Sequence, residues 1–520
     1  MSYQLVWFKR DLRCEDHAAL VQAARLGPIR CIYVLEPALW VQPDVALQHF
    51  EFIRESLQDL DAQLRIRGGT LEIHVGETME VLTKIWQTSP FQGLHSHQET
   101  GNSFTYARDR EVSKWCQAHN IYWGEYAQFG VTRGLKNRNL WQALWQKHME
   151  APLCDLSQIQ FWKPSISTNL TLNSDTDHLT PSLMQAPLYL NHNPPLRQRG
   201  GRSAALKVLN SFLKQRCMGY RGGISSPLSA PDACSRLSVY LSYGCLSIRE
   251  VVQATNEELL QTPPQASRKI AGLSAFMSRL YWHCHFIQKL ESEPEIEWQN
   301  MHRGYDGLRE TEFNDDHFNA LKNARTGWPM VDACVTMLRE TGWLNFRMRA
   351  MLVSVAAYPL WLHWRPVGEW LATQFLDYEP GIHWSQLQMQ SGTTGINITR
   401  VYNPIKQAQD HDPKGIFVRR WLPCMRKVPD TCIFEPWKMS QEMQNKVGLY
   451  VGKDLPEPLV DIAAATKISK DRLYARRNTS EVRAGKQSVV DKHASRAKTT
   501  RNKISKTQEK NTSSQLSLEF

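Results

Sequence analysis

The chain has 520 residues, of which 42% are hydrophobic and 22% charged. At roughly 150 residues per domain this length predicts two to four domains, and the composition excludes a wholly disordered or collagen-like chain. No apolar run reaches the roughly 18 residues that span a bilayer, and charges interrupt the N-terminus where a signal peptide needs an apolar core. We therefore expect a soluble, cytoplasmic protein with no membrane partner.

The net charge of +11 is concentrated near the C-terminus. Residues 467–510 hold 14 lysines and arginines against 4 acidic residues, which gives +10. Such an excess of positive charge favours an anionic partner. The rest of the chain is close to neutral, so a basic groove there would need local clustering.

The cysteines and histidines give no clear metal-binding pattern. The 11 cysteines form no CxxC pair and are odd in number, which is typical of reduced thiols in a cytosolic protein. No fourth ligand stands out near Cys334, Cys424 and Cys432, as an iron–sulfur cluster would need. His283 and His285 are two residues apart and would face different sides of a helix. We predict no metal site.

Residues 1–130 alternate short apolar runs with amphipathic helical segments, such as the one around Ile53 and Leu60. This alternation predicts an α/β domain with a doubly wound parallel sheet, whose ligands lie at the carboxyl ends of the strands. No GxGxxG sequence follows the first strand, so a standard dinucleotide fingerprint is absent. The expected strands are Leu5–Phe8, Ile29–Leu35, Leu71–Val75, Phe91–His95 and Ile121–Tyr126.

The remaining chain divides into three parts. Residues 131–200 include a polar, proline-bearing stretch and are expected to be an interdomain linker. Residues 201–478 show helical periodicity throughout, which predicts a large all-α domain. Residues 479–520 are rich in Lys, Arg, Ser and Thr, so we expect a disordered basic tail. The expected helices of the all-α domain are Ala204–Arg216, Ser247–Thr255, Ser267–Leu290, Met330–Glu340, Arg347–His363 and Val367–Leu376.

Four segments of the helical domain carry side chains suited to chemistry. A serine pair that opens a helix can supply N–H and hydroxyl groups to an anion, although an ordinary helix cap has the same sequence. Taken singly, each of the other three segments is equally compatible with a solvated turn or the end of a core helix. The segments are Tyr220 with Cys234–Ser238, Arg279–Phe286, Gly342–Arg349, and Asp377–Trp384 followed by Gly392–Gly395.

Taken in this order after the first strand, these segments resemble the cryptochrome/photolyase family from about residue 3 to 478. The resemblance implies a non-covalent FAD in the helical domain and an antenna pigment, a folate or a deazaflavin, in the N-terminal antenna domain. Glu99–Arg108 resembles the segment near the antenna pigment, and an empty antenna site is the alternative. The most specific stretches are Val6–Arg13, Ser235–Ser238, Thr326–Ala333, Gly342–Arg349 and Asp412–Pro423.

The resemblance assigns roles to single residues around the flavin. Arg349 and Asp377 match the ion pair beside the isoalloxazine ring. His383 matches the position facing flavin N5, where many photolyases have Asn, and it would control flavin protonation. The cofactor-binding residues carried over are Tyr220, Cys234, Ser235, Arg236, Leu237, Ser238, Phe276, Arg349, Asp377, Tyr378, Glu379 and His383.

The resemblance also assigns residues to catalysis and electron transfer. Trp282 matches the tryptophan that stacks on a pyrimidine dimer flipped out of DNA. Together with Arg279 and His383 it forms the expected catalytic set, and Arg279, Trp282 and Arg347 are the expected DNA contacts. Photoreduction in this family runs through tryptophans: Trp364 matches the middle member. The position of the inner member aligns to Leu387, which is not a tryptophan. Trp384 is therefore only a candidate for the inner member.

The chain departs from the residue pattern of the family at two positions, which leaves two interpretations of its function open. Photolyases that repair cyclobutane dimers usually have Glu where Arg279 stands, and the usual adenine-proximal Asn is Phe346, with Asn345 one place earlier. The first interpretation is an FAD-dependent, blue-light-driven DNA photolyase. It would reverse UV-induced pyrimidine dimers by electron transfer from reduced flavin. The alternative is a cryptochrome that uses the flavin for light signalling.

The expected partners are UV-damaged DNA and, through the C-terminus, a protein. The chain ends in Gln515-Leu-Ser-Leu-Glu-Phe520, which resembles the short peptides by which bacterial DNA-repair proteins bind the replication sliding clamp. The alternative is a terminus without a partner. We expect a monomer that associates with the nucleoid when it binds DNA.

A peptide covering residues 505–520 should bind purified sliding clamp weakly, because ordering the peptide offsets part of the contact energy. Leu518→Ala combined with Phe520→Ala should abolish binding in a calorimetric titration. No binding of the native peptide at high micromolar concentration would leave the tail as a DNA tether.

Overall fold

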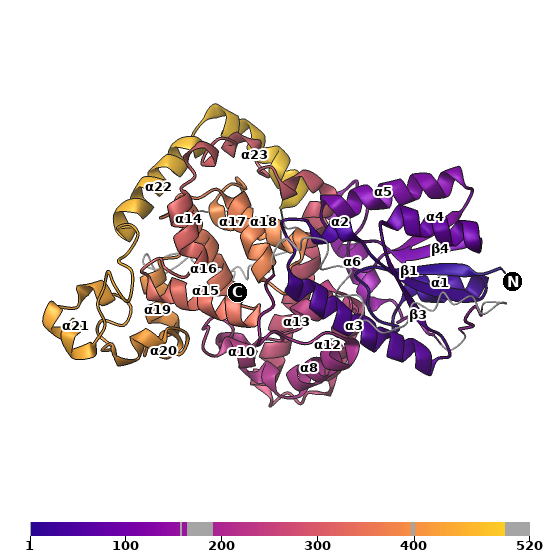
Figure 1. Ribbon diagram of the computed structural model, residues 1–520, viewed down its shortest axis with the longest axis horizontal. Coiled ribbons are helices and arrows are strands. Elements are labelled where there is room, and N and C mark those ends of the chain that lie inside the picture. The colour runs from indigo at the N-terminus through magenta and orange to yellow at the C-terminus, as the bar shows by residue number, and fades with distance from the viewer. Residues whose placement is uncertain (1, 157–158, 164–190, 397–400, 495–520) are drawn as a thin grey trace, which may run out of the picture.

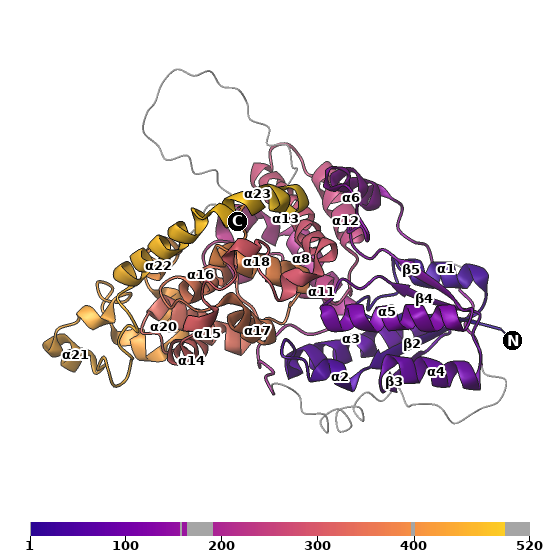
Figure 2. The same cartoon turned by 90° about the horizontal axis from the view of Figure 1, so that it is seen from above.

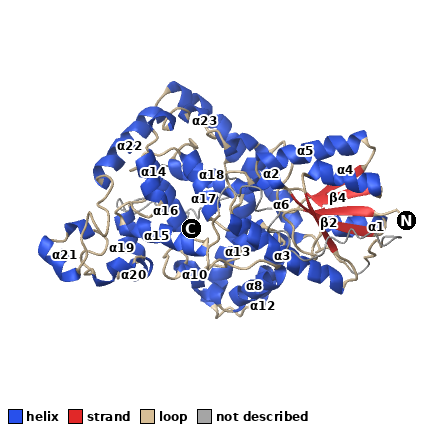
Figure 3. Cartoon of the chain, in the orientation of Figure 1, coloured by secondary structure: helices blue, strands red, loops and turns tan. Residues whose placement is uncertain are grey.

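The computed structural model describes residues 2–156, 159–163, 191–396 and 401–494. All strands of the sheet lie at one end of the molecule, and the rest of the described chain is mainly helical (Figures 1, 2 and 3). The C-terminal segment Gln515–Phe520 lies outside the described residues. None of the helices in the described ranges is both long and apolar enough to cross a membrane.

The N-terminal unit contains a five-stranded, all-parallel sheet with the order β3-β2-β1-β4-β5. This is the doubly wound arrangement predicted from the sequence, because β1 lies in the middle and the chain winds outward in both directions. The strands are β1 (Gln4–Phe8), β2 (Ile29–Leu35), β3 (Leu71–Val75), β4 (Gly93–His97) and β5 (Tyr122–Tyr126).

Alternate residues of the central strand face opposite layers of helices. Val6 and Phe8 pack with α1 (Ala18–Leu26) and α3 (Leu47–Ile66). The intervening Leu5 and Trp7 pack with α4 (Thr78–Thr88) and α5 (Ser103–Ala118) on the other side, where Figure 1 shows these two helices together. The strand is therefore apolar on both faces, as a buried parallel strand must be.

The helical body confirms the all-α prediction for the second half of the chain. The helix expected over Arg347–His363 is too long, since it ends at Ala357. Pro359 disfavours helical backbone in the residue before it and lacks an N–H to continue the ladder. The helices are α8 (Arg202–Lys214), α9 (Tyr220–Gly223), α10 (Ala230–Ala233), α11 (Ser238–Ser242), α12 (Ile248–Gln261), α13 (Ser267–Ser292), α14 (Asp315–Lys322), α15 (Pro329–Thr341), α16 (Phe346–Ala357), α17 (Trp364–Gln374), α18 (Pro380–Ser391), α19 (Pro404–His411), α20 (Ile416–Trp421), α21 (Gln441–Val447) and α22 (Ile462–Arg477).

Two segments differ from the predicted organisation. The linker prediction for 131–200 missed α6 (Trp141–Glu150), which packs against α12. The expectation of disorder from residue 479 is wrong for α23 (Ser480–His493), seen beside α22 in Figure 1. Val482 and Val489 of α23 are buried, and His493 Nε2 lies 2.6 Å from a carboxylate oxygen of Glu293. Composition alone could not reveal this apolar face of two valines one heptad apart.

The loop after β1 joins the α/β unit to the helical body. Leu12 N–H donates to the Tyr243 carbonyl at 3.1 Å, and Arg13 donates to the Gly244 carbonyl at 3.0 Å. Arg10 donates to the carbonyls of Ser242 and Tyr378, both at 2.9 Å. These contacts tie the loop after β1 to segments more than two hundred positions later in the chain.

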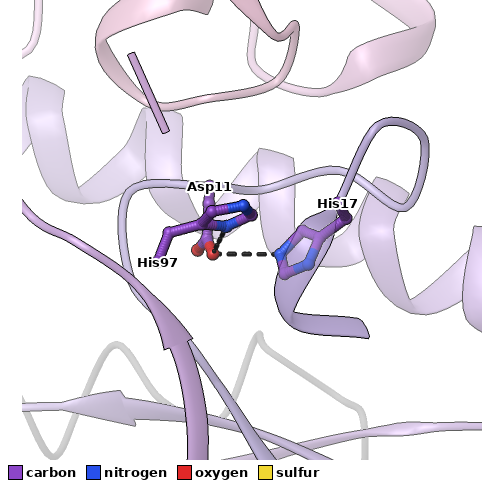
Figure 4. Close-up of side chains that lie close together, drawn as sticks. All are labelled: Asp11, His17 and His97. Carbon is purple, nitrogen blue, oxygen red and sulfur yellow. Dashed lines mark hydrogen bonds and ion pairs between the residues drawn. The ribbon is translucent and has the colours of Figure 1, made fainter. Parts of the chain in front are cut away.

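A buried carboxylate holds this loop in shape. Asp11 accepts hydrogen bonds from Lys9 N–H and from His97 Nδ1, both at 2.7 Å, and His17 Nε2 lies 2.9 Å away (Figure 4). Burial alone would raise the pKa of Asp11, but His17 and His97 hold it well below its usual range. Asp11 is therefore ionised, and both histidines serve as its donors.

The same three residues are also spaced closely enough to hold a metal ion. However, His17 Nδ1 accepts a hydrogen bond from Leu20 N–H at 3.1 Å, at the start of α1. Neutral His17 therefore carries its proton on Nε2, facing Asp11, and has no lone pair there for a metal. We interpret the cluster as a hydrogen-bonded support of the loop.

Asp11→Ala should lower the free energy of unfolding by about 3 to 5 kcal/mol, because it removes a buried, fully used acceptor and leaves its donors unpaired. Urea denaturation followed by circular dichroism would measure this. Asp410→Ala is the matched control: its pair with Lys406 is exposed and should contribute less than about 0.5 kcal/mol. Equal effects of the two substitutions would contradict a supporting role for Asp11.

Candidate functional site

A cavity of about 300 Å³ lies inside the helical body. Its walls come from α13, α16, α17 and α18, from α9 and α11, and from the segments that precede α11, α16 and α18. Residues from 220 to 390 thus meet around one space. Proximity of this kind cannot be read from any one of the sequence segments.

Two helices present regular stripes of side chains to the cavity. On α13 the lining residues Arg279, Trp282 and Phe286 stand at i, i+3 and i+7, which places them on one face. On α18 the lining stripe follows the same spacing and consists of His383, Gln386, Leu387 and Gln390.

The structure brings most of the predicted site residues together. Ten of the predicted cofactor-binding residues line the cavity, and so do Arg279, Trp282 and Arg347. Leu237 and Phe276 do not: both are buried in the apolar core, with the Phe276 ring 5.9 Å from that of Tyr220. The lining residues from the prediction are Tyr220, Cys234, Ser235, Arg236, Ser238, Arg349, Asp377, Tyr378, Glu379 and His383.

Several lining residues were missed by the sequence analysis. Among them are Phe375, Gln386 and Gln390, together with Phe286 and Trp343, which lie in segments already singled out but were given no role of their own. Phe286, Gln386 and Gln390 could have been found, because they continue the helical spacing that starts at Trp282 and His383.

One end of the cavity is built around the predicted ion pair. Arg349 lies 3.0 Å from the Asp377 carboxylate, and its Nε donates to the Leu344 carbonyl at 2.6 Å. The guanidinium also stacks over the Phe375 ring at 4.1 Å. These contacts fix a cation at the cavity wall, where a negative charge on a bound ring would be stabilised.

The segment before α11 supplies a second cation. Arg236 has φ of 61°, in the left-handed region, and its guanidinium lies 3.8 Å from the Trp343 ring centroid. Burial lowers its pKa to about 10, so it remains charged at neutral pH. Because burial also raises the pKa of the Cys234 thiol to about 12, that residue is a neutral neighbour. Arg236 with the hydroxyls of Ser235 and Ser238 is suited to an anionic group such as a diphosphate.

The polar atoms of the wall indicate a missing polar ligand. Five buried atoms that belong to lining residues have no hydrogen-bond partner: Glu379 Oε1, Asp377 Oδ1, Arg347 Nε, Asn345 Oδ1 and His283 Nε2. Of these, Asp377 Oδ1 lies 3.0 Å from Arg349 in the ion pair. Such atoms are costly unless a ligand pairs with them. Together with the cations at Arg236 and Arg349, they fit a cofactor that carries both a polar ring and a diphosphate, as FAD does.

His383, which lines the cavity, has a neutral ring with one acceptor nitrogen. Its Nε2 donates to the Gly368 carbonyl at 2.8 Å, because a carbonyl can only accept. Burial lowers the pKa of His383 to about 3, so the ring stays neutral at physiological pH. Nδ1 therefore carries a lone pair and no proton.

The two predicted electron-transfer tryptophans lie next to each other behind this wall. Their ring centroids are 6.0 Å apart, and Trp384 lies 4.9 Å from His383. Neither tryptophan lines the cavity, whereas Leu387 does. Trp364 is buried and donates from Nε1 to Asn300 Oδ1 at 2.8 Å.

Arg279 is held at the cavity wall by Tyr220. The Arg279 and Tyr220 side chains are hydrogen-bonded. Burial raises the pKa of the Tyr220 hydroxyl, and this effect is larger than the lowering of the pKa by Arg279. Trp282 packs edge-on against His285 at 4.9 Å and also contacts Phe286 at 5.8 Å. A cation and two aromatic rings thus stand side by side on α13.

A second, smaller cavity of about 80 Å³ lies at the carboxyl ends of the strands, where a doubly wound sheet binds its ligands. Arg108 occupies its wall and is paired with Glu36 at 2.8 Å, Glu99 at 2.5 Å and Asp109 at 2.9 Å. Trp40 Nε1, another lining atom, is buried without a partner. Tyr378 lines both cavities.

Comparison with known proteins places the fold and the site in one family. Residues 4–128 match the family described as DNA photolyase, and residues 276–475 match the FAD binding domain of DNA photolyase. The chain is 24% identical over 520 residues to cryptochrome-1 of Aedes aegypti, covering 92% of this chain and 94% of that one. It is 26% identical over 494 residues to the deoxyribodipyrimidine photo-lyase of Escherichia coli, covering 89% and 96%.

Solved structures share the whole architecture. A class III photolyase from Agrobacterium tumefaciens superimposes with a TM-score of 0.76 at 22% identity, covering 92% of this chain and 98% of that one. A cryptochrome from Synechocystis gives a TM-score of 0.78 at 23% identity, covering 91% and 99%. The fold and the cavity define a protein with an FAD-binding helical domain. The chain belongs to the cryptochrome/photolyase family.

Glu379 should make the stability of the FAD-free protein depend on pH. Burial raises its pKa from the ordinary 4.5 to about 7, although Arg10 opposes the shift. The stabilisation from the protonated form is complete below pH 4.5 and is lost as the pH rises through 7, by about 3 kcal/mol in total. Glu379→Gln should therefore flatten the fall in the urea-unfolding free energy between about pH 5 and 8. Parallel curves for the two proteins would contradict this.

Proposed function

We propose that the protein is a light-driven DNA lyase that uses FAD to reverse UV-induced pyrimidine dimers. The observation that carries the proposal is the coexistence, in one cavity, of a flavin-type wall and an aromatic, cationic wall suited to a flipped base. Bound FAD would supply the photoexcited electron. The chain's own residues bind, orient and shield the reactants.

Each wall has its own part in this proposal. Arg349 and Asp377 orient the flavin ring, while Arg236, Ser235 and Ser238 hold the diphosphate. Trp282 offers its π-face to an extruded base, since stacking does not depend on base sequence. Arg279 and Arg347 attract the phosphate backbone. His383 accepts a hydrogen bond at Nδ1 and has no proton there to donate.

Two further parts of the proposal concern light and electrons. Trp384 and Trp364 form a relay behind His383, supported by the 6.0 Å between their rings. An antenna pigment would occupy the second cavity, where Trp40 Nε1 offers an unused donor. An archaeal photolyase of the same fold from Sulfolobus tokodaii is described with two FAD molecules, with the implication of a novel light-harvesting cofactor.

A light-signalling cryptochrome is the second candidate. The observation that favours it is the replacement of a carboxylate by Arg279 at the cavity wall, with the apolar Phe346 nearby. Neither side chain can accept hydrogen bonds from a base in the way a carboxylate does. In a strain that lacks the protein, normal repair with altered light-dependent transcription would identify a cryptochrome.

Purified protein carrying reduced FAD should remove a defined cyclobutane dimer from an oligonucleotide under blue light and not in the dark. Repair is measured by chromatography of the oligonucleotide on single- and double-stranded substrates. Arg279→Ala should weaken binding of dimer-containing DNA and reduce the slope of log Kd against log salt by about 1, with unchanged FAD content.

Arg268→Ala is the control for that substitution, because Arg268 is exposed on the same helix and away from the cavity. Arg279→Glu tests whether a carboxylate at this position changes the rate of dimer repair. Intact dimers in both kinds of DNA after illumination of the wild-type protein would refute the proposed activity. Loss of FAD from Arg279→Ala would place Arg279 in the cofactor site.

A further inference from the structure

Helix α18 carries two glutamines on the face that lines the cavity. Gln386 and Gln390 are separated by one helical turn and follow His383 at i+3 and i+7. Gln390 is only 5% exposed. Their amide groups therefore belong to the cavity and not to the protein surface.

The protein itself makes little use of these two amides. Among the described residues their only recorded hydrogen bond is between Gln390 Nε2 and Gln386 Oε1, at a long 3.5 Å. Each amide offers two N–H donors and an oxygen with two lone pairs. Most of this capacity is not used by the protein and remains available to a ligand in the cavity.

Gln388, on another face of the same helix, shows what a structural glutamine does here. Its Nε2 donates to the carbonyls of Ile296 and Gln299, both at 2.8 Å. Its Oε1 accepts from Met301 N–H at 2.5 Å. The contrast indicates that Gln386 and Gln390 are reserved for a ligand.

The surrounding wall defines the chemistry of that ligand. Each carboxylate that lines the cavity has an arginine beside it, Arg349 for Asp377 and Arg10 for Glu379, although Glu379 Oε1 still lacks a hydrogen-bond partner. Trp282, Phe286 and Phe346 supply flat apolar surfaces. A planar heterocycle with alternating acceptors and donors on one edge would use both the rings and the amides.

We propose that Gln386 and Gln390 read the imide edge of a pyrimidine base, with its C=O, N–H and C=O groups, when the base is held in the cavity. This inference rests on the proposed function. It names residues that would take the place of the glutamate that photolyases usually have where Arg279 stands. One amide N–H donates to a ring carbonyl, and an amide oxygen accepts from the ring N3–H. The pyrimidine ring of the flavin has the same edge, so the experiment must separate the two ligands.

The test uses FAD-loaded protein with Gln386→Leu, Gln390→Leu and the exposed control Gln261→Leu on α12. Fluorescence anisotropy measures Kd for an oligonucleotide with one thymine dimer, for the undamaged oligonucleotide, and for a dimer methylated at N3 of both bases. The flavin-to-protein absorbance ratio reports FAD content separately.

Each cavity variant should bind the dimer about 5- to 100-fold more weakly, as expected for loss of a paired base contact, while its FAD content and its affinity for undamaged DNA stay at the wild-type level. N3-methylation of the dimer should weaken its binding to the wild-type protein. The loss of affinity on methylation should be smaller in the variant that lacks the acceptor for N3–H, because the substitution and the methylation remove the same contact. Gln261→Leu should match the wild type throughout.

Three results would overturn the inference, and they have different meanings. Unchanged dimer affinity in both cavity variants, with a wild type that discriminates dimer from undamaged DNA, refutes the role of the glutamines alone. Loss of FAD from the variants assigns the amides to the flavin edge. A wild-type protein with no preference for the dimer refutes the proposed function together with the inference.

Discussion

The Asp11 carboxylate is the point on which the arrangement of the two parts of the molecule depends. It is fully buried, ionised, and surrounded by donors from the residue after β1, from the start of α1 and from the end of β4. A charge in such a place is tolerable only when its hydrogen-bonding capacity is met. The loop that satisfies it is then fixed in the one shape that lets Arg10 reach Glu379 at 3.3 Å in the flavin cavity. Electrostatics in the α/β unit thus set the position of a wall in the helical body.

The sheet and the first helices of the body also share one hydrophobic core. Val6 and Phe8 of β1 belong to the same buried cluster as Phe212 of α8, Leu246 before α12 and Leu273 of α13. A second cluster contains α15, α16 and α17, and the cavity lies where residues of both clusters meet. The boundary expected at residue 200 separates two secondary-structure classes, but no solvent layer separates the sheet from α8 and α13.

Local patterns predicted the elements well, and family resemblance predicted much of the site. Strand positions followed from short apolar runs, and thirteen of the lining residues were named from the family resemblance. Leu237 and Phe276 do not line the cavity. Leu237 lies in a matched segment and Phe276 lies on the helix that carries Trp282, yet both are buried in the apolar core. Arg10 was read only as part of a matching segment, because its partners Ser242 and Tyr378 are determined by tertiary structure. Helix α23 was missed because two buried valines carry little weight in a segment dominated by charge.

The contacts that complete the cavity also constrain the order in which the chain can fold. Arg10 donates to a carbonyl 368 positions later, and Gln48 of α3 donates to the Thr373 carbonyl, 325 positions later. During synthesis the α/β unit leaves the ribosome first, while its partners on α13 and beside α18 do not yet exist. The apolar face of the unit that packs against α8 and α13 stays uncovered until these helices have been synthesised. Contacts that close such long loops also form slowly. The flavin cavity is therefore a late product of folding, assembled when the segment around Thr373 and Tyr378 packs against the loop after β1 and against α3.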